Sequence, residues 1–260
     1  MKEKILRNCF VLGLLFLCIF QFSLYSQAES LSNELLAWGF RRGENHEQAV
    51  LDVKSQKVIQ KYNGISMGNK DSKNIYLTFD CGYEAGYTEA ILDVLEKYNV
   101  NAAFFITGHY LNSASDLVKR MIEDGHIVGN HTVNHKCLPN ISDDEIKSEI
   151  MNLHNGLYEK LGYEMTYFRP PKGEFSERAI DIITNLGYKT VMWSSAYDDW
   201  DNSKQGRVEY GKKKIIENLH NGCVILLHST SEDNSKILEE VIIEARDLGY
   251  EFKSLNEFEK

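Results

Sequence analysis

The sequence predicts an α/β fold in which about seven parallel strands close into a barrel. From residue 75 onward, short apolar runs alternate with longer amphipathic stretches, as in proteins built from βα units. Most of the amphipathic stretches end near a glycine, as helices often do, at Gly125, Gly162, Gly187 and Gly249. Neither half of this region is rich in one kind of element, so the pattern favours one parallel sheet over two domains.

The expected strands are short runs of apolar, β-branched and aromatic residues bounded by polar or turn-forming residues. They cover residues 75–79, 102–107, 126–129, 166–168, 189–193, 223–227 and 250–252. The expected helices lie near residues 88–98, 115–124, 142–161, 176–186, 210–219 and 235–248. The third helix begins with a capping box, in which Ser142 and Glu145 each accept a hydrogen bond from the other's backbone N–H.

Composition limits the functional classes. The 260 residues are 43% hydrophobic, which is enough for one full core. The net charge of −9 disfavours nucleic acid or an anionic membrane surface as the main partner, and nothing indicates an obligate protein partner. After residue 28 only Cys81, Cys137 and Cys223 remain, an odd and small number that does not suggest a disulfide-built fold.

Residues 1–28 resemble an export signal. Three basic residues precede an apolar run at residues 9–20, and the small residues Ser26 and Ala28 stand at the positions that a signal peptidase reads. The sequence therefore predicts export across the cytoplasmic membrane. An uncleaved signal, with apolar residues continuing to Tyr25, would instead anchor the protein in the membrane.

Residues 29–74 are polar and interrupted, and we expect them to form an N-terminal arm that packs its aromatic side chains on the main domain, residues 75–260. The arm contains Gly64-Ile65-Ser66-Met67-Gly68, which fits the nucleophile elbow of serine hydrolases. That motif needs a buried strand before it and a helix after it, and the polar flanking residues provide neither. We therefore expect no nucleophilic serine here.

Polar residues gather where the predicted strands end. Asp80 follows the first strand, His131 and His135 follow the third, Arg169 follows the fourth, and His228 ends the sixth. The carboxyl ends of the strands in a β/α barrel meet at one rim, where catalysis takes place. Each residue alone also has a structural explanation, such as a turn cap for Asp80 or a core position for His228.

The residue types at this rim indicate metal and acid–base chemistry. His131 and His135 are four residues apart, a spacing that can bring two imidazoles to one metal ion. Arg169 precedes two prolines, which donate no N–H, so the next backbone donor is that of Lys172 on a rigid turn. An imidazole such as His228, at a strand end beside acids, can donate a proton near neutral pH.

Five segments occur in a characteristic order. They are Thr78-Phe79-Asp80, His131-Thr132-x-x-His135, Arg169-Pro170-Pro171-x-Gly173, Asp199-Trp200 and Leu226-x-His228. Together they resemble the motifs of the polysaccharide deacetylase family, also called the NodB-homology or carbohydrate esterase 4 family. The resemblance spans roughly residues 75–255 and implies a distorted (β/α) barrel. It also implies hydrolysis of N- or O-acetyl groups on sugars with a divalent metal, commonly zinc.

The resemblance implies a role for each matched residue. Asp80 would be the general base, His131 and His135 would bind the metal, Arg169 would orient Asp80, and His228 would protonate the leaving amine. The resemblance also implies four residues that contact the substrate. The N–H of Lys172 would stabilise the oxyanion, Trp200 and Leu226 would line the acetyl pocket, and Asp199 would lie beside them.

The chain departs from the family pattern at two positions. Cys81 stands where the family has an Asp as third metal ligand, so Cys81 is a doubtful ligand. Either its thiolate binds a soft metal such as zinc, or two histidines and water hold the ion more weakly. Ala196 stands where the fourth motif has an acid, which leaves the tuning of His228 to Asp198 or Asp199.

These departures, with Gly82-Tyr83-Glu84 and Trp38-Gly39-Phe40, make the chain similar to one branch of the family. That branch comprises spore-cortex enzymes that deacetylate N-acetylmuramic acid on the way to muramic δ-lactam. The implied substrate is peptidoglycan glycan without peptide stems, in the cell wall or spore cortex, and the same enzyme could close the lactam. Two alternatives stay open: a deacetylase of N-acetylglucosamine in peptidoglycan or chitin, and a non-catalytic module that binds cell-wall glycan.

Overall fold

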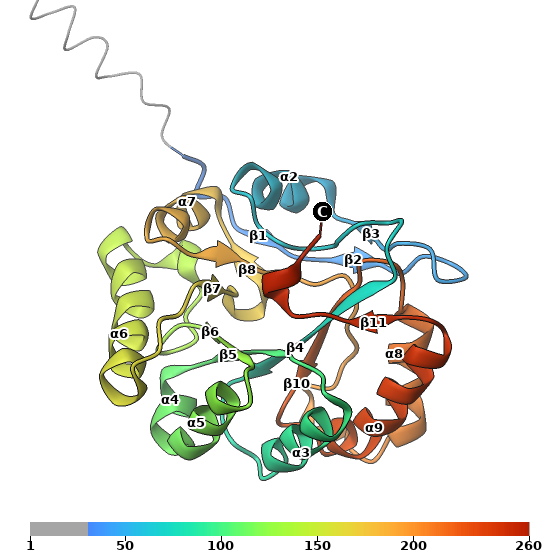
Figure 1. The fold of residues 1–260 in the computed structure, drawn as a ribbon. Helices are drawn as coiled ribbons and strands as arrows, with labels where there is room; N and C mark the ends of the chain where they lie inside the picture. Colours follow the sequence, from blue (N-terminus) through green and yellow to red (C-terminus); the bar gives the residue numbers. More distant parts are fainter. Residues whose placement is uncertain (1–30, 260) are drawn as a thin grey trace, which may run out of the picture. The chain divides into compact units, whose positions relative to one another are not determined.

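The fold is organised around one parallel sheet (Figure 1). The structure is a computed structural model that describes residues 31–259, and the predicted export signal at residues 1–28 lies outside them. Its strands are β4 (Asn74–Cys81), β5 (Ala103–Ile106), β6 (Ile127–Asn130), β7 (Tyr167–Phe168), β9 (Lys189–Thr190), β10 (Val224–His228) and β11 (Glu251–Phe252). The order in the sheet is β10-β4-β5-β6-β7-β9, with β11 also paired to β4. All seven predicted strands are present, which confirms the parallel α/β fold.

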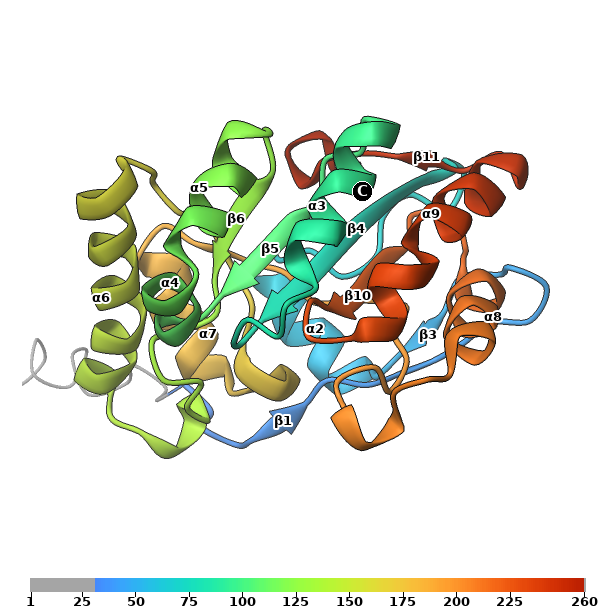
Figure 2. The same ribbon diagram turned by 90° about the horizontal axis from the view of Figure 1, so that it is seen from below.

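The sheet curls until its two outer edges approach each other. Just after β9, Ser195 forms a parallel bridge with Ile225 of β10. An isolated bridge in place of a full strand pair is what makes this barrel distorted. The strong curl brings the carboxyl ends of β4, β6, β7 and β10 toward one rim. In Figure 2 the arrows of β4, β5 and β10 end on the same side of the sheet.

Helices surround the sheet (Figure 1). They are α3 (Thr88–Tyr98), α4 (Gly108–Ser113), α5 (Ser115–Glu123), α6 (Asp143–Leu161), α7 (Glu177–Asn185), α8 (Val208–Asn218) and α9 (Glu232–Asp247). Helix α6 begins with the predicted capping box, because Glu145 N–H donates to Ser142 Oγ at 3.3 Å and Ser142 N–H donates to Glu145 Oε2 at 3.0 Å. Residues 31–259 also form four short 3₁₀ helices: Leu138–Asn140, Pro171–Gly173, Asn202–Lys204 and Leu255–Glu257.

Strand β4 presents two different faces. Leu77, Phe79 and Cys81 are buried in the large apolar core between the sheet and the helices. Thr78 and Asp80 lie on the opposite, inner face, because side chains alternate along a strand. The same alternation that directs Asp80 toward the barrel interior therefore directs the neighbouring Cys81 away from it.

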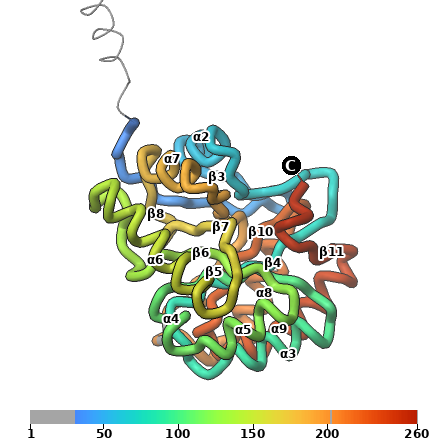
Figure 3. Tube along the Cα trace, turned by 60° about the vertical axis from the view of Figure 1, so that its left-hand side comes forward, coloured from blue at the N-terminus to red at the C-terminus, as the bar shows by residue number. Residues whose placement is uncertain are grey.

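The segment before β4 is more regular than the irregular arm expected from the sequence. It forms β1 (Leu36–Ala37), β2 (Phe40–Arg41), β3 (Val50–Leu51) and α2 (Val53–Lys61), and β1 pairs with β8 (Glu174–Phe175). Trp38 is buried, and its indole N–H donates to the carbonyl of Trp193 at 2.8 Å. Figure 3 shows this blue segment running beside β8, with α2 next to α7. No strand–turn–helix surrounds Ser66 among the described residues.

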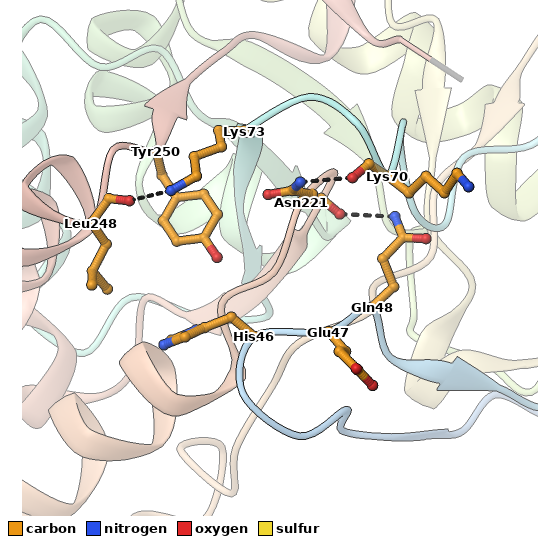
Figure 4. Close-up of a pocket in the computed structure, with 8 residues that line it drawn as sticks. All are labelled: His46, Glu47, Gln48, Lys70, Lys73, Asn221, Leu248 and Tyr250. Atoms are coloured by element: carbon orange, nitrogen blue, oxygen red, sulfur yellow. Dashed lines mark hydrogen bonds between the residues drawn. The ribbon is translucent and has the colours of Figure 1, made fainter.

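A polar hollow lies where several strands begin, at the end of the sheet opposite the predicted site (Figure 4). Gln48 Nε2 donates to the carbonyls of Gly68 and Asn221 at 3.0 and 2.9 Å, and Asn221 Nδ2 donates to Lys70 O at 2.6 Å. Lys73 Nζ donates to Leu248 O at 2.6 Å. These bonds join the N-terminal segment to the barrel.

None of the helices formed by residues 31–259 has the length and apolar character needed to cross a membrane.

Candidate active site

The predicted catalytic residues converge on one pocket of about 580 Å³ at the carboxyl ends of the strands. Its lining is Asp80, Gly82, Tyr83, His131, His135, Lys172, Trp193, Trp200, Leu226, His228 and Thr230. Four of the five residues implied to carry the chemistry are in this set, and the fifth, Arg169, is buried beneath Asp80. Segments from the ends of β4, β6, β7, β9 and β10 therefore contribute to a single cavity.

Asp80 is held by a buried arginine. Arg169 Nη1 donates to Asp80 Oδ1 at 2.8 Å, Nη2 donates to Thr78 Oγ1 at 2.9 Å, and Nε donates to Val191 O at 3.0 Å. Burial alone would raise the pKa of Asp80, but Arg169 and then the imidazoles of His131 and His228 outweigh it and lower the pKa below its usual value. Asp80 is therefore an ionised carboxylate with a fixed orientation.

The two histidines after β6 are poised as neutral imidazoles. His131 Nδ1 lies 2.8 Å from the Arg169 carbonyl, which can only accept, so Nδ1 carries the proton. Nε2 is then left with its lone pair, 3.5 Å from Asp80 Oδ2. The ring centroids of His131 and His135 are 4.9 Å apart. Burial lowers the pKa of both histidines, that of His135 to about 4, so both can act as metal ligands at neutral pH.

His131 and His135 are the neutral imidazoles that this pocket offers to a divalent ion. Among residues 31–259 no three His, Cys, Asp or Glu side chains are grouped in a way that could hold a metal. A hydrogen bond from the second ring nitrogen to a backbone carbonyl, as in His131, is typical of metal-binding histidines. Two imidazoles would leave the remaining positions of the ion to water or substrate.

Cys81, the doubtful third ligand, is placed elsewhere. Its side chain is fully buried in the apolar core with Phe79 and does not line the pocket. Burial raises the pKa of this thiol, which keeps it protonated, whereas a metal needs the thiolate. The alternation of side chains along β4 described above directs Asp80 to the barrel interior and Cys81 to the apolar core.

His228 is supported by a buried acid. Its Nδ1 lies 2.9 Å from Asp199 Oδ1, and its backbone N–H donates to Asp199 Oδ2 at 2.7 Å. Burial alone would lower the pKa of His228, but the charge and hydrogen bond of Asp199 raise it above the usual value. His228 is therefore suited to donate a proton, and Asp198, the other candidate for tuning it, pairs with Lys204.

Asp199 thus differs from the prediction that it contacts substrate. It is buried and absent from the pocket lining, because its two oxygens turn inward to His228 and Asn234. Asn234, which sequence reasoning missed, donates through Nδ2 to Asp199 Oδ2 at 2.6 Å and accepts from the Tyr197 hydroxyl at 2.6 Å. Its position in the first turn of α9 gave no motif that would have revealed it.

The remaining predicted residues line the pocket. Leu226 is buried at its wall, Trp200 is largely exposed, and Lys172 is exposed beside them. Sequence reasoning assigned no role to Trp193 or Tyr83, which also line it. A fixed carboxylate and a supported imidazole at one cavity provide a base and an acid, the pair that hydrolysis of an amide requires.

Comparison with known proteins identifies relatives over almost the whole chain. The sequence model described as Polysaccharide deacetylase matches residues 67–191. The chain is 40% identical over 238 residues to "Peptidoglycan-N-acetylmuramic acid deacetylase PdaA" of Bacillus subtilis (strain 168), covering 90% of both chains. It is 33% identical over 190 residues to a "Peptidoglycan-N-acetylglucosamine deacetylase" of Bacillus cereus, covering 72% of this chain and 88% of that protein.

Structural comparison agrees. The solved structure of Bacillus subtilis PdaA, described as a family 4 carbohydrate esterase, superposes with a TM-score of 0.85 at 39% identity. The match covers 88% of this chain and 98% of that one.

Proposed function

Because the chain belongs to the polysaccharide deacetylase family, a family of hydrolases, we propose that it removes the acetyl group from N-acetylmuramic acid in peptidoglycan glycan without peptide stems. The choice of N-acetylmuramic acid as the sugar rests on the 40% identity over 90% of the Bacillus subtilis muramic acid deacetylase. The pocket that joins Asp80, His131, His135 and His228 supports the choice of reaction. The amine freed beside the lactyl carboxyl would lead to muramic δ-lactam in spore cortex.

In this proposal each residue has one task. Asp80 removes a proton from the attacking water, and Arg169 keeps its carboxylate ionised and oriented. The Lys172 N–H, which donates to no other described group, stabilises the oxyanion of the tetrahedral intermediate. His228 then gives its proton to the leaving amine. Leu226 and Trp200 enclose the acetyl methyl group.

We further propose that His131 and His135 hold a divalent ion, most simply zinc, because neutral imidazoles are good zinc ligands. When bound, such an ion polarises an acetyl oxygen and lowers the pKa of water. The proposed place of action is the cell wall or spore cortex, reached by export through residues 1–28.

A second candidate is deacetylation of N-acetylglucosamine. The likeness to the Bacillus cereus enzyme of that name favours it, although it covers 72% of this chain against 90% for the muramic acid enzyme. The catalytic residues would serve either sugar, because the acetamide group is the same in both.

The proposal is tested by measuring acetate release from peptide-free peptidoglycan glycan, stem-bearing peptidoglycan and chitooligosaccharides. We expect the highest kcat/KM on the peptide-free glycan, and a loss of roughly 10²–10⁴-fold in Asp80→Asn, since that variant removes the general base. Release only from chitooligosaccharides would favour the second candidate. Folded protein that releases acetate from none of them, with added zinc, would contradict both.

A further inference from the structure

We propose that the side-chain ammonium of Lys172 binds the free lactyl carboxylate of muramic acid and so selects glycan strands that carry no peptide stem. This inference rests on the proposed function and deepens it, because it names the residue that reads the state of the substrate. The role assigned above to Lys172 concerned only its backbone N–H.

The first argument is an uncommitted positive charge. Among the described residues that line the pocket, Lys172 is the only lysine or arginine. Its side chain is exposed and, within the described part of the chain, has neither an ion pair nor a hydrogen bond. Arg169, by contrast, is fully buried, and each of its three side-chain nitrogens donates a hydrogen bond, to Asp80, Thr78 or Val191. In a chain of net charge −9, such a cation at a substrate pocket is free to meet an anion.

The second argument is how the turn that carries Lys172 is built. Lys172 has φ 57° and ψ 7°, a left-handed conformation that is uncommon for a residue with a side chain. Pro170 and Pro171 precede it, and Gly173 N–H closes the turn on Pro170 O at 3.0 Å. The N-terminal segment holds it from outside, because Trp38 N–H donates to Gly173 O at 2.9 Å. An unfavourable conformation held by several supports is typical of functional positions.

The third argument is the chemistry of the substrate. In N-acetylmuramic acid the lactyl ether is on the ring carbon next to the one that bears the acetamide. An acetamide placed at Asp80 therefore puts the lactyl group one ring carbon away, in the same pocket that Lys172 lines. Without a peptide stem the lactyl group ends in a carboxylate. With a stem that carboxyl is a neutral amide, and N-acetylglucosamine has only a hydroxyl there, so an ammonium distinguishes the free acid from both by charge.

The first test needs only the wild-type protein. It compares kcat/KM on peptide-free glycan with kcat/KM on the same glycan after its lactyl carboxyls have been converted to methylamides. We expect a preference of roughly 10- to 100-fold for the free acid, the size of one charge-assisted hydrogen bond, and a smaller preference at high salt. Equal values on the two glycans would overturn the proposal.

The second test assigns the preference to Lys172. In Lys172→Met the ratio of the two kcat/KM values should fall roughly 10- to 100-fold, while Lys172→Arg should retain most of it. Lys57→Met, which removes an exposed charge on α2, is the matched control and should keep the wild-type ratio. A ratio in Lys172→Met equal to that of the wild type, including an equal loss on both glycans, would overturn the proposal.

Failure of this inference can be told from failure of the proposed function. Acetate release from both muramic acid glycans at equal rates would leave the proposed function intact and remove only the role of Lys172. Binding gives an answer independent of turnover: in the Asp80→Asn background, calorimetry with muramic acid oligosaccharides should show roughly 10- to 100-fold tighter binding of the free acid than of the methylamide. Equal Kd values would count against the role of Lys172.

Discussion

At the scale of single residues, the proton on His228 depends on the environment of one buried carboxylate. Asp199 accepts hydrogen bonds from the His228 backbone at 2.7 Å and from Asn234 at 2.6 Å, and its other oxygen lies 2.9 Å from His228 Nδ1. These contacts fix its orientation, and Tyr197 in turn fixes Asn234. His228 is thereby kept as an acid by residues that lie behind it and do not line the pocket.

The replacement Asp199→Asn tests this support. Since Asp199 raises the pKa of His228, its loss should let the imidazolium give up its proton at lower pH. We expect the alkaline limb of the kcat/KM profile to move to lower pH and kcat to fall by roughly 10- to 100-fold. Asp198→Asn is the matched control, because Asp198 pairs with Lys204 and Arg207. If the alkaline limb of Asp199→Asn coincided with that of the wild type, Asp199 would not be what raises the pKa of His228.

Residue identities were predictable where chemistry restricts the choice. A carboxylate, two imidazoles and an arginine at successive strand ends indicated a site before any coordinates, and the structure places them around one pocket. The direction of a side chain was harder to predict. Cys81 follows Asp80 directly but faces the opposite side of β4, and Asp199 turns inward although it precedes Trp200 at the pocket. Asn234 has no sequence signal because its role depends wholly on tertiary contacts.

At the scale of elements, the turn at Pro171–Gly173 depends on the N-terminal segment. Strand β1 pairs with β8 directly after the turn, and Trp38 packs against Gly173. A Cβ on Gly173 would lie 2.8 Å from the Trp193 ring and 3.0 Å from Trp38 Cβ. The close approach of two tryptophans therefore requires glycine here for space as well as for its φ of 69°.

Two glycines with nearly equal φ angles separate the effect of space from that of φ. Gly162 ends α6 with φ 67° and has no atom within 4 Å of a built Cβ, so Gly162→Ala should cost about 1 kcal/mol of unfolding free energy. Gly173→Ala has a similar positive φ and, in addition, the clash with both tryptophans, and should cost roughly 1–3 kcal/mol more. Urea unfolding of the two variants measures this difference in unfolding free energy. Equal losses in the two variants would contradict a steric cost at Gly173.

The elements that sequence patterns predicted are those with a strong internal periodicity. Strand β4 and helix α3 match their expected ranges closely, because each carries its apolar pattern within its own residues. Helix α4 was missed: it has six residues and begins at Gly108, too short for a helical period to be recognised. Strands β1, β2 and β3 have two residues each and exist through their pairing, which a local pattern does not reveal.

At the scale of the whole molecule, strand order places the proposed acid beside the proposed base. β10 lies beside β4 in register, with His228 opposite Asp80, so the proposed acid and base stand on neighbouring strands. The histidines reach the same pocket from beyond β6, two strands away on the other side of β4. This arrangement depends on the curl of the sheet, which the alternation of elements predicted as a barrel, although the single bridge that closes it was not predictable.

The most direct measurement is to locate the acetyl group that is lost. Peptide-free glycan is treated with the exported part of the chain and zinc, then digested to disaccharides and analysed by mass spectrometry. The proposal predicts that muramic acid residues lose their acetyl groups while neighbouring glucosamine residues keep theirs, and that Asp80→Asn produces no such loss. Acetyl loss confined to glucosamine, or undiminished loss with Asp80→Asn, would contradict it.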